Sequence, residues 1–179
     1  QLVRGMLRRL RPANLDSLGL VAALQELCES WEERSGIDCA FHHTGLSDSL
    51  GDAIDIAVYR VTQEALTNVM RHARASSVRV MLSHTLGMAS EAPGVRLSIQ
   101  DDGQGMDTAA STRGLGLLGS AERAAGLGGE LRVESTPGAG VLISLWIPLA
   151  APAPSAVVTE AAGLAQASAG GVHHTTAQA

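Results

Sequence analysis

The chain has 179 residues, a formal net charge of −5 and 45% apolar side chains. This composition supports a buried core and excludes a globally disordered chain, and the length suits one domain of about 130–150 residues with short appendages. The acidic balance argues against nucleic acid as a partner, no apolar run is long enough to cross a membrane, and two cysteines without metal-ligand spacing indicate a reduced cytoplasmic protein.

The N-terminal part of the chain carries two helical patterns. Residues 1–11 place apolar side chains on one face with arginines between them, which predicts the end of an amphipathic helix stopped by Pro12. A second helix is expected to begin at a cap formed by Asp16 or Ser17 and to end near Gly36. Its apolar stripe consists of Leu20, Leu24, Leu27 and Trp31.

The middle of the chain alternates between strand and helix patterns. Residues 37–43 are typical of a strand, and the apolar spacing of residues 50–73 predicts a long helix. Two β-like runs follow at 77–85 and 95–100, and the Gly/Pro loop between them favours a hairpin.

The C-terminal part begins with a glycine-rich stretch at 101–119 and a short helix that ends near Ala125. Strands are expected at 130–135 and 140–148, around a Pro-Gly turn. The order of elements predicts an α+β fold, in which one mixed, mostly antiparallel sheet carries helices on one face. Residues 150–179 are rich in Ala, and we expect a flexible tail there.

Three polar residues on the long helix form a row, called the polar row below: Glu64, Asn68 and His72, at positions i, i+4 and i+8. Because the apolar stripe lies on the other side of the helix, a solvated surface is the simplest interpretation of the row. Its chemistry also suits a magnesium site, because Mg²⁺ prefers oxygen ligands and few protein contacts, and a histidine could contact a phosphate.

A second candidate site follows the strand at 95–100, in the sequence Asp101-Asp102-Gly103-Gln104-Gly105. A carboxylate at a strand end can accept a hydrogen bond from an exocyclic amine, and glycines beside it allow close backbone approach. A simple Asp-Gly turn is the alternative.

The glycines Gly114, Gly116 and Gly119 match a dinucleotide-binding pattern, but a polar segment precedes them where that fold needs a buried strand. We therefore interpret this segment as a loop that exposes backbone amides at a helix N-terminus, which suits a polyphosphate.

Five segments taken together closely resemble the catalytic ATP-binding domain of bacterial sensor histidine kinases: LRPANLDSLGLVAAL (10–24), QEALTNVMRHA (63–73), DDGQGMD (101–107), GLGLLGSAERAAGLGGELRVES (114–135) and PGAG…IP (137–148). Within that family they are similar to the nitrate/nitrite-sensor kind, which is paired with LuxR-type response regulators. The resemblance implies a GHKL (Bergerat) α/β sandwich over residues 12–149 that binds ATP and Mg²⁺, and it implies that residues 1–11 end a dimerisation helix hairpin.

By position, the resemblance implies a role for each member of the polar row. Glu64 matches the catalytic acid near the γ-phosphate and would contact the metal through water. Asn68 matches the Mg²⁺ ligand, and His72 matches a contact on the phosphate side.

The glycine-rich residues match the rest of the nucleotide site. Asp101 corresponds to the acceptor of the adenine amine, and Gly103 and Gly105 complete that pocket. Further nucleotide contacts are implied in the lid at Gly114, Leu115, Gly116 and Leu117.

The resemblance also implies partners: a phosphoacceptor domain of the same protein, a homodimeric parent and a downstream response regulator. The chain itself is expected to be monomeric and cytoplasmic, and an inner-membrane anchor in the parent is left open. None of its six histidines lies in an acceptor-like motif, and Val141 and Arg113 depart from the residues common in the family. Two alternatives therefore remain: a nucleotide-sensing interaction module without transfer activity, and another GHKL ATPase or serine kinase.

Overall fold

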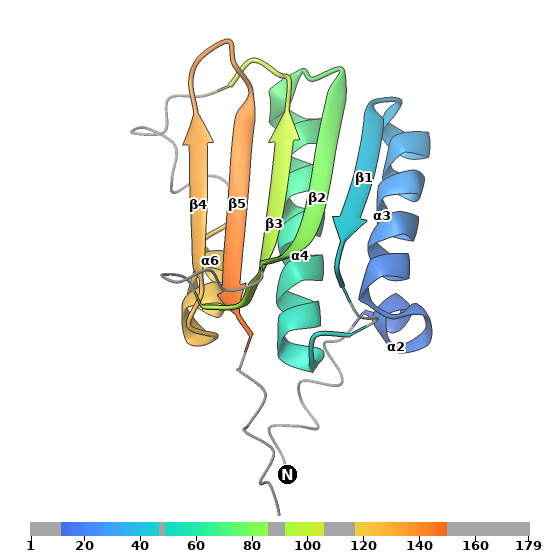
Figure 1. Ribbon diagram of the computed structural model, residues 1–179. Coiled ribbons are helices and arrows are strands. Elements are labelled where there is room, and N and C mark those ends of the chain that lie inside the picture. Colours follow the sequence, from blue (N-terminus) through green and yellow to red (C-terminus); the bar gives the residue numbers. More distant parts are fainter. Residues whose placement is uncertain (1–11, 47–48, 86–91, 106–116, 150–179) are drawn as a thin grey trace, which may run out of the picture.

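The computed structural model of the protein describes residues 12–46, 49–85, 92–105 and 117–149 (Figure 1). The chain order of the elements is α2 Ala13–Leu18, α3 Leu20–Ser35, β1 Asp38–Thr44, α4 Asp52–Asn68, η1 Val69–Ala73, β2 Ser77–Thr85, β3 Gly94–Asp101, α6 Leu118–Gly126, β4 Glu130–Ser135 and β5 Val141–Pro148.

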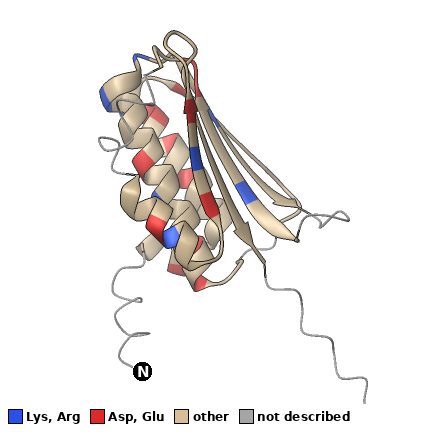
Figure 2. Ribbon diagram, turned by 90° about the vertical axis from the view of Figure 1, so that its left-hand side faces the viewer, with Lys and Arg blue, Asp and Glu red and all other residues tan. Residues whose placement is uncertain are grey.

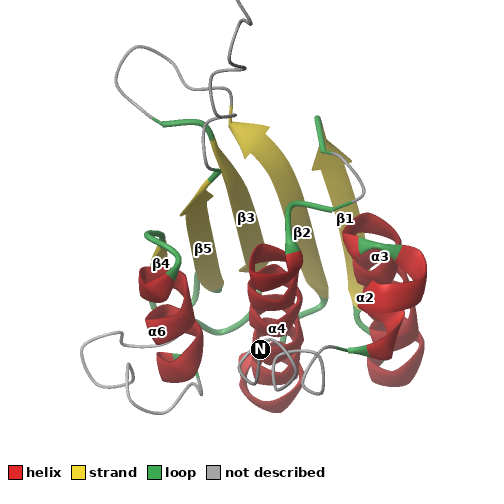
Figure 3. Ribbon diagram, turned by 90° about the horizontal axis from the view of Figure 1, so that it is seen from below, coloured by secondary structure: helices red, strands yellow, loops and turns green. Residues whose placement is uncertain are grey.

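The strands form one five-stranded sheet in the order β1-β2-β3-β5-β4. Among the strands that the structure describes, only β1 and β2 pair in parallel, and the other neighbours are antiparallel. A parallel pair needs a crossover connection, which α4 and η1 supply here. All the described helices lie on one face of the sheet, as the edge-on view and the view from below show (Figures 2 and 3). The predicted α+β fold is confirmed.

The core lies between this helical layer and the sheet. Alternate residues of the central strands point into it, because successive side chains of a strand face opposite sides. The strands contribute the buried residues Val78, Val80, Leu82, Val95, Leu97, Ile99, Ile143, Leu145 and Ile147. The helices contribute, among others, Leu20, Leu24, Cys28, Trp31, Val58, Val61, Ala65 and Val69. The expected apolar stripes of both long helices are therefore buried except for the partly exposed Leu27 and Ile54.

The expected cap at Asp16 or Ser17 is wrong. The chain is already helical from Ala13, directly after Pro12, and it breaks at Gly19 before α3 begins. Gly19 has φ 79° and ψ 171°, a backbone conformation that is essentially restricted to glycine. The Ser17 hydroxyl donates to the carbonyls of its own helix and caps nothing.

The long helix expected at 50–73 changes type before its end. It is α-helical from Asp52 to Asn68, and Val69–Ala73 form a π-helical turn. The turn ends at Arg74, which has a left-handed backbone with φ 51°. Because a π-helix bonds i to i+5, residues beyond Asn68 no longer follow the spacing that the sequence pattern assumes.

Each of the five described strands begins and ends within about one residue of its expected bounds. The expected helix end at 1–11 and the tail at 150–179 lie outside the described residues, so the domain boundaries stay predictions. In the part of the chain that the structure describes, no helix is both long and apolar enough to cross a membrane.

Candidate functional site

The alternation of buried residues along β3 ends on a carboxylate. Val95, Leu97 and Ile99 face the helices, and Asp101 continues this series with only 5% of its surface exposed. One carboxylate oxygen of Asp101 accepts the Gly103 N–H at 2.8 Å. Burial raises the pKa of the Asp101 carboxyl, while hydrogen bonds from the backbone N–H groups of Gly103 and Val141 oppose that rise. The strand therefore presents a carboxylate on the helix-covered side of the sheet.

The residues that follow, called the glycine segment below (101–105), connect two distant parts of the chain. The backbone N–H of Gln104 donates to the Ala73 carbonyl at 2.7 Å, and its side-chain amide donates to the His72 carbonyl at 2.7 Å. On its other side, the Gln104 carbonyl accepts the Gly138 N–H at 2.6 Å. The segment is thus bonded both to the end of η1 and to the β4–β5 turn.

Close backbone contacts explain why glycines stand in this segment. A Cβ atom at Gly103 would lie 2.3 Å from the Ala73 carbonyl oxygen. At Gly105 the backbone has φ +64°, and a Cβ atom would lie 2.1 Å from the Thr136 carbonyl oxygen. No side chain fits at either distance, so the segment is pressed against η1 and against the turn.

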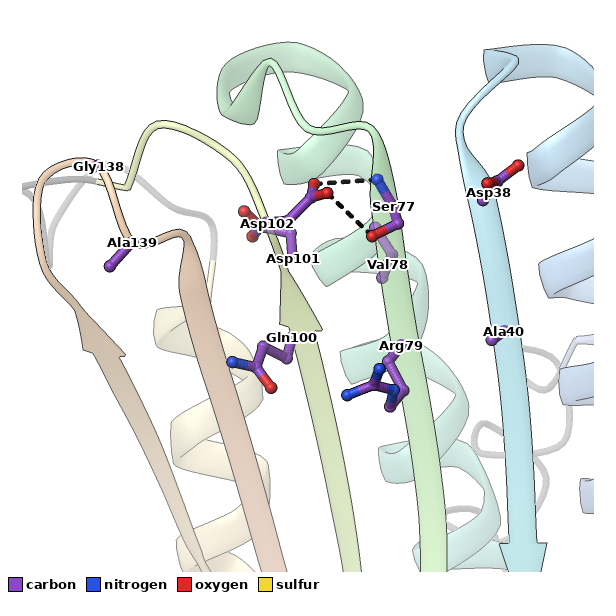
Figure 4. Close-up of a pocket in the computed structure, with 10 residues that line it drawn as sticks. All are labelled: Asp38, Ala40, Ser77, Val78, Arg79, Gln100, Asp101, Asp102, Gly138 and Ala139. Atoms are coloured by element: carbon purple, nitrogen blue, oxygen red, sulfur yellow. Dashed lines mark hydrogen bonds between the residues drawn. The ribbon is translucent and has the colours of Figure 1, made fainter.

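The neighbouring carboxylate, Asp102, has a structural role that the sequence did not indicate. It is exposed and accepts hydrogen bonds from the backbone N–H and the hydroxyl of both Ser76 and Ser77, at 2.5–3.0 Å. The two bonds from Ser77 are visible in Figure 4. These bonds hold the pKa of the Asp102 carboxyl well below its ordinary value. Asp102 therefore fixes the start of β2 to the end of β3.

The polar row lies on α4 and its π-helical continuation. Glu64 and Asn68 are half-buried on the α-helical part, and His72 is exposed in η1. The π-turn shifts His72 away from the straight row that the i, i+4, i+8 spacing predicts. What the structure brings together is the His72 backbone and the glycine segment, through the Gln104 side chain.

Helix α6 lies next to α4 in the helical layer (Figure 3). Leu117, directly before α6, is 5% exposed and belongs to the core. The other lid residues predicted to contact nucleotide, Gly114, Leu115 and Gly116, lie outside the described residues, as does Arg113.

A shallow depression of about 440 Å³ lies on the opposite, open face of the sheet. Arg79 and Gln100 point into it from β2 and β3, and Asp38 and Ala139 lie at its rim (Figure 4). Its lining contains no member of the polar row, but it includes Asp101 and Asp102, so the depression adjoins the glycine segment at the end of β3. Among the described residues, no group of three or more His, Cys, Asp or Glu could hold a metal.

A second buried carboxylate, Asp55, was also missed by the sequence interpretation. It is fully buried in the first turn of α4, where it accepts the Ser49 hydroxyl at 2.7 Å and the Leu50 N–H at 3.0 Å. An acidic residue in a first helical turn after Ser-Leu-Gly was the available signal. Asp55 fixes the loop that leads into the helix of the polar row.

The chain matches the family described as "Histidine kinase-, DNA gyrase B-, and HSP90-like ATPase" over residues 53–151, and it belongs to that family. The match contains α4 except for its first residue, the glycine segment and both C-terminal strands. Within the family, the chain is the ATP-binding catalytic domain of a sensor histidine kinase, as the following relatives show.

The chain is 38% identical over 164 residues to the sensor histidine kinase MctS of Rhizobium johnstonii, covering 89% of this chain and 34% of that protein. It is 34% identical over 148 residues to the signal transduction histidine-protein kinase/phosphatase DegS of Brevibacillus brevis, covering 82% of this chain and 37% of that protein. For UhpB of Salmonella typhimurium, a signal transduction histidine-protein kinase/phosphatase, the values are 38% over 148 residues, covering 80% and 28%. The chain thus spans roughly a third of the length of these curated relatives.

Solved structures share the fold. The histidine kinase domain of a blue-light activated histidine kinase from Erythrobacter litoralis aligns with a TM-score of 0.59 at 24% identity, covering 82% of this chain and 73% of that one. The histidine kinase AdeS of Acinetobacter baumannii aligns with a TM-score of 0.51 at 15% identity, covering 74% and 64%.

Proposed function

We propose that this domain binds Mg·ATP between the glycine segment and the polar row and presents the γ-phosphate to a histidine of a separate dimerisation domain. A response regulator of the LuxR type would then receive the phosphoryl group. The observation that carries this proposal is the buried Asp101 carboxylate, which is bonded through the glycine segment to the end of the helix that bears Glu64 and Asn68.

Asp101 is suited to the recognition of adenine. Its oxygen Oδ1 is already engaged by Gly103, so the carboxylate is oriented before any ligand arrives. The amino group of adenine would donate a charge-assisted hydrogen bond to this carboxylate. Guanine has a carbonyl at that position, so two hydrogen-bond acceptors would face each other. Gly103 and Gly105 would let the backbone lie flat beside the base, since neither position has room for a side chain.

Asn68 and Glu64 are suited to a hydrated magnesium ion. Both side chains offer oxygen atoms from a half-buried face of α4, and Mg²⁺ commonly takes one or two protein ligands together with phosphate oxygens and water. The ion would neutralise the charge of the phosphates. Asn68 would contact the ion directly, Glu64 would act through water near the γ-phosphate, and His72 would lie on the phosphate side.

The lid would close the phosphate end of the site. We assign this role to Gly114, Leu115, Gly116 and Leu117, whose backbone amides precede α6. Catalysis in such a site consists of positioning and charge stabilisation. We place the domain in the cytoplasm, where ATP is available, as a monomer that works within a homodimeric parent.

The metal assignment is tested by Asn68→Ala in the full chain, with ATP affinity measured by calorimetry with Mg²⁺ and with EDTA. We expect the variant to lose the Mg²⁺-dependent part of the affinity and to keep the circular dichroism spectrum of the wild type. Thr67→Ala is the matched control, because Thr67 is also half-buried and its hydroxyl donates a hydrogen bond to the Gln63 carbonyl of the same helix. ATP binding that is insensitive to both EDTA and Asn68→Ala would refute the assignment.

Transfer is tested with labelled ATP. The chain alone should form no acid-labile phosphohistidine, and addition of the acceptor-containing dimerisation domain of the parent should restore labelling that Glu64→Ala abolishes. Labelling of His42, His43, His72 or His84 in the chain alone would contradict this division of labour. Tight ATP binding without any labelling of the added domain would favour the nucleotide-sensing module instead.

A further inference from the structure

Two cysteines outside the nucleotide site lie on α3 and β1, two elements that pack against each other. Cys28 is buried in the middle of α3, and Cys39 is half-buried as the second residue of β1. The two elements pack side by side at the edge of the molecule (Figure 1). Cys28 belongs to the apolar core, and Cys39 packs against the edge of that core.

The environment gives the two thiols different reactivities. Donation from Cys28 holds the pKa of the Cys39 thiol below its ordinary value, although burial and the Glu32 carboxylate act in the opposite direction. The pKa of Cys28 is raised by that same hydrogen bond, by burial and by the charges of Cys39, Glu29 and Glu32. Because the thiolate is the nucleophile, Cys39 is the more reactive sulfur and also the more accessible one.

The backbone around Cys39 is held in place. The Glu32 carboxylate of α3 accepts the Cys39 N–H at 2.7 Å, and the strand pairs with Val78 of β2 at this position. Glu32 lies one helical turn after Cys28, so Cys39 is fixed to α3 close to Cys28, at the junction of α3 and β1. A disulfide requires this kind of proximity, since Cα atoms more than about 7 Å apart cannot be bridged without backbone movement.

We propose that Cys28 and Cys39 form a thiol pair that peroxide converts into an intramolecular disulfide. The Cys39 thiolate attacks a peroxide oxygen, the O–O bond breaks, and the departing hydroxide takes up a proton to give water, which leaves a sulfenic acid on Cys39. The Cys28 sulfur then attacks the Cys39 sulfur. An S–S bond forms, the S–O bond breaks, and the oxygen leaves as a second water with the sulfenic hydrogen and the Cys28 proton. Two thiols are oxidised and one peroxide is reduced.

The test is titration of the reduced full chain with hydrogen peroxide, followed by alkylation in denaturant and mass spectrometry. We expect the mass to fall by two hydrogen atoms, with both cysteines protected from alkylation and joined in one cross-linked peptide. The reaction should be at least about tenfold faster in the folded chain than in urea, where the sulfurs are separated. Equal rates in the two conditions, or disulfides between chains, would overturn the proposal.

Two variants assign the roles of the sulfurs. With Cys28→Ala, Cys39 should be oxidised beyond the sulfenic acid, because the resolving thiol is absent; Cys28→Ser is the second variant if the smaller side chain impairs folding. With Cys39→Ser, the buried Cys28 should remain reduced at the same peroxide concentration. Oxidation of Cys28 as fast as in the wild type would show that Cys39 is not the attacking sulfur.

Discussion

The two halves of the candidate site are held in place by different means. The glycine segment is fixed by backbone hydrogen bonds to η1 and to the β4–β5 turn, and its glycines leave no room for a Cβ atom. The polar row stands on the outer side of a helix whose opposite side is buried in the core. A side chain of the row can therefore be changed without disturbing the fold, whereas a side chain added at Gly103 or Gly105 alters fold and ligand site together.

The largest effect is expected at the tightest contact of the glycine segment. Gly105→Ala places a Cβ atom 2.1 Å from the Thr136 oxygen at a backbone φ of +64°, so the turn must move. We expect a loss of about 2–4 kcal/mol in the free energy of unfolding, measured by urea denaturation. Gly138→Ala is the matched control, because Gly138 also has a positive φ, +83°, but nothing within 4 Å.

The control variant should lose only about 1–2 kcal/mol, the cost of a left-handed backbone for a residue with a Cβ atom. Equal losses for the two variants would mean that conformational strain, and not close approach, requires glycine at position 105.

A smaller effect, confined to ligand binding, is expected at Asp101. In Asp101→Asn the amide oxygen can satisfy Gly103 only by turning the NH₂ group toward the base, so an acceptor is lost. We expect ATP affinity to fall at least about tenfold, because a hydrogen bond to a charged group contributes about 1.5–3 kcal/mol, and we expect the preference for ATP over GTP to narrow. Calorimetry with both nucleotides measures this.

The stability of Asp101→Asn without nucleotide separates binding from folding. Because burial raises the pKa of the Asp101 carboxyl in the folded state, its ionised form opposes folding at neutral pH, and a neutral amide removes that penalty. The melting temperature at neutral pH should therefore not fall. A marked loss of stability, or equal affinity of the wild type for GTP and ATP, would refute the adenine-binding role.

The smallest effect is expected at Asp102. The serine hydrogen bonds lower the pKa of its carboxyl in the folded state below the ordinary value of 3.8. Its stabilising contribution is therefore complete above that value and is lost as the pH falls through it toward the folded-state pKa. Thermal melts should show Asp102→Asn slightly less stable than the wild type at neutral pH, with the difference disappearing in acid. A difference that persists or grows in acid would contradict the serine cap.

The sequence predicted the parts of the fold that depend on local pattern. The alternating runs predicted the strands to within about one residue. Asp101, expected directly after the strand at 95–100, is the last residue of β3, and its role in binding stays a prediction. Those features follow from side-chain periodicity and from the positions of glycine and proline.

The remaining features depend on contacts that are remote in sequence. The role of Asp102 depends on serines 26 and 25 residues away, and the role of Gln104 depends on carbonyls at the end of η1. The π-helical turn, which moves His72 off the row, is only five residues long, and this is too short for a periodic pattern of apolar residues to reveal it. The helix break at Gly19 was missed because a cap residue nearby offered an equally plausible start.

The parallel pairing of β1 with β2 has a consequence for the order in which the sheet assembles. The pairs β2–β3 and β4–β5 each join strands that follow one another in the chain. Strands β1 and β2 are instead separated in the chain by α4 and η1. Their pairing therefore requires closure of a long loop, which costs conformational entropy before the hydrogen bonds between the strands form. As an outer strand, β1 has a neighbour on one side only. It is therefore the strand that docks late and opens early, and amide exchange should be fastest there. A link between Cys28 and Cys39 would tie this strand to α3 and slow its release.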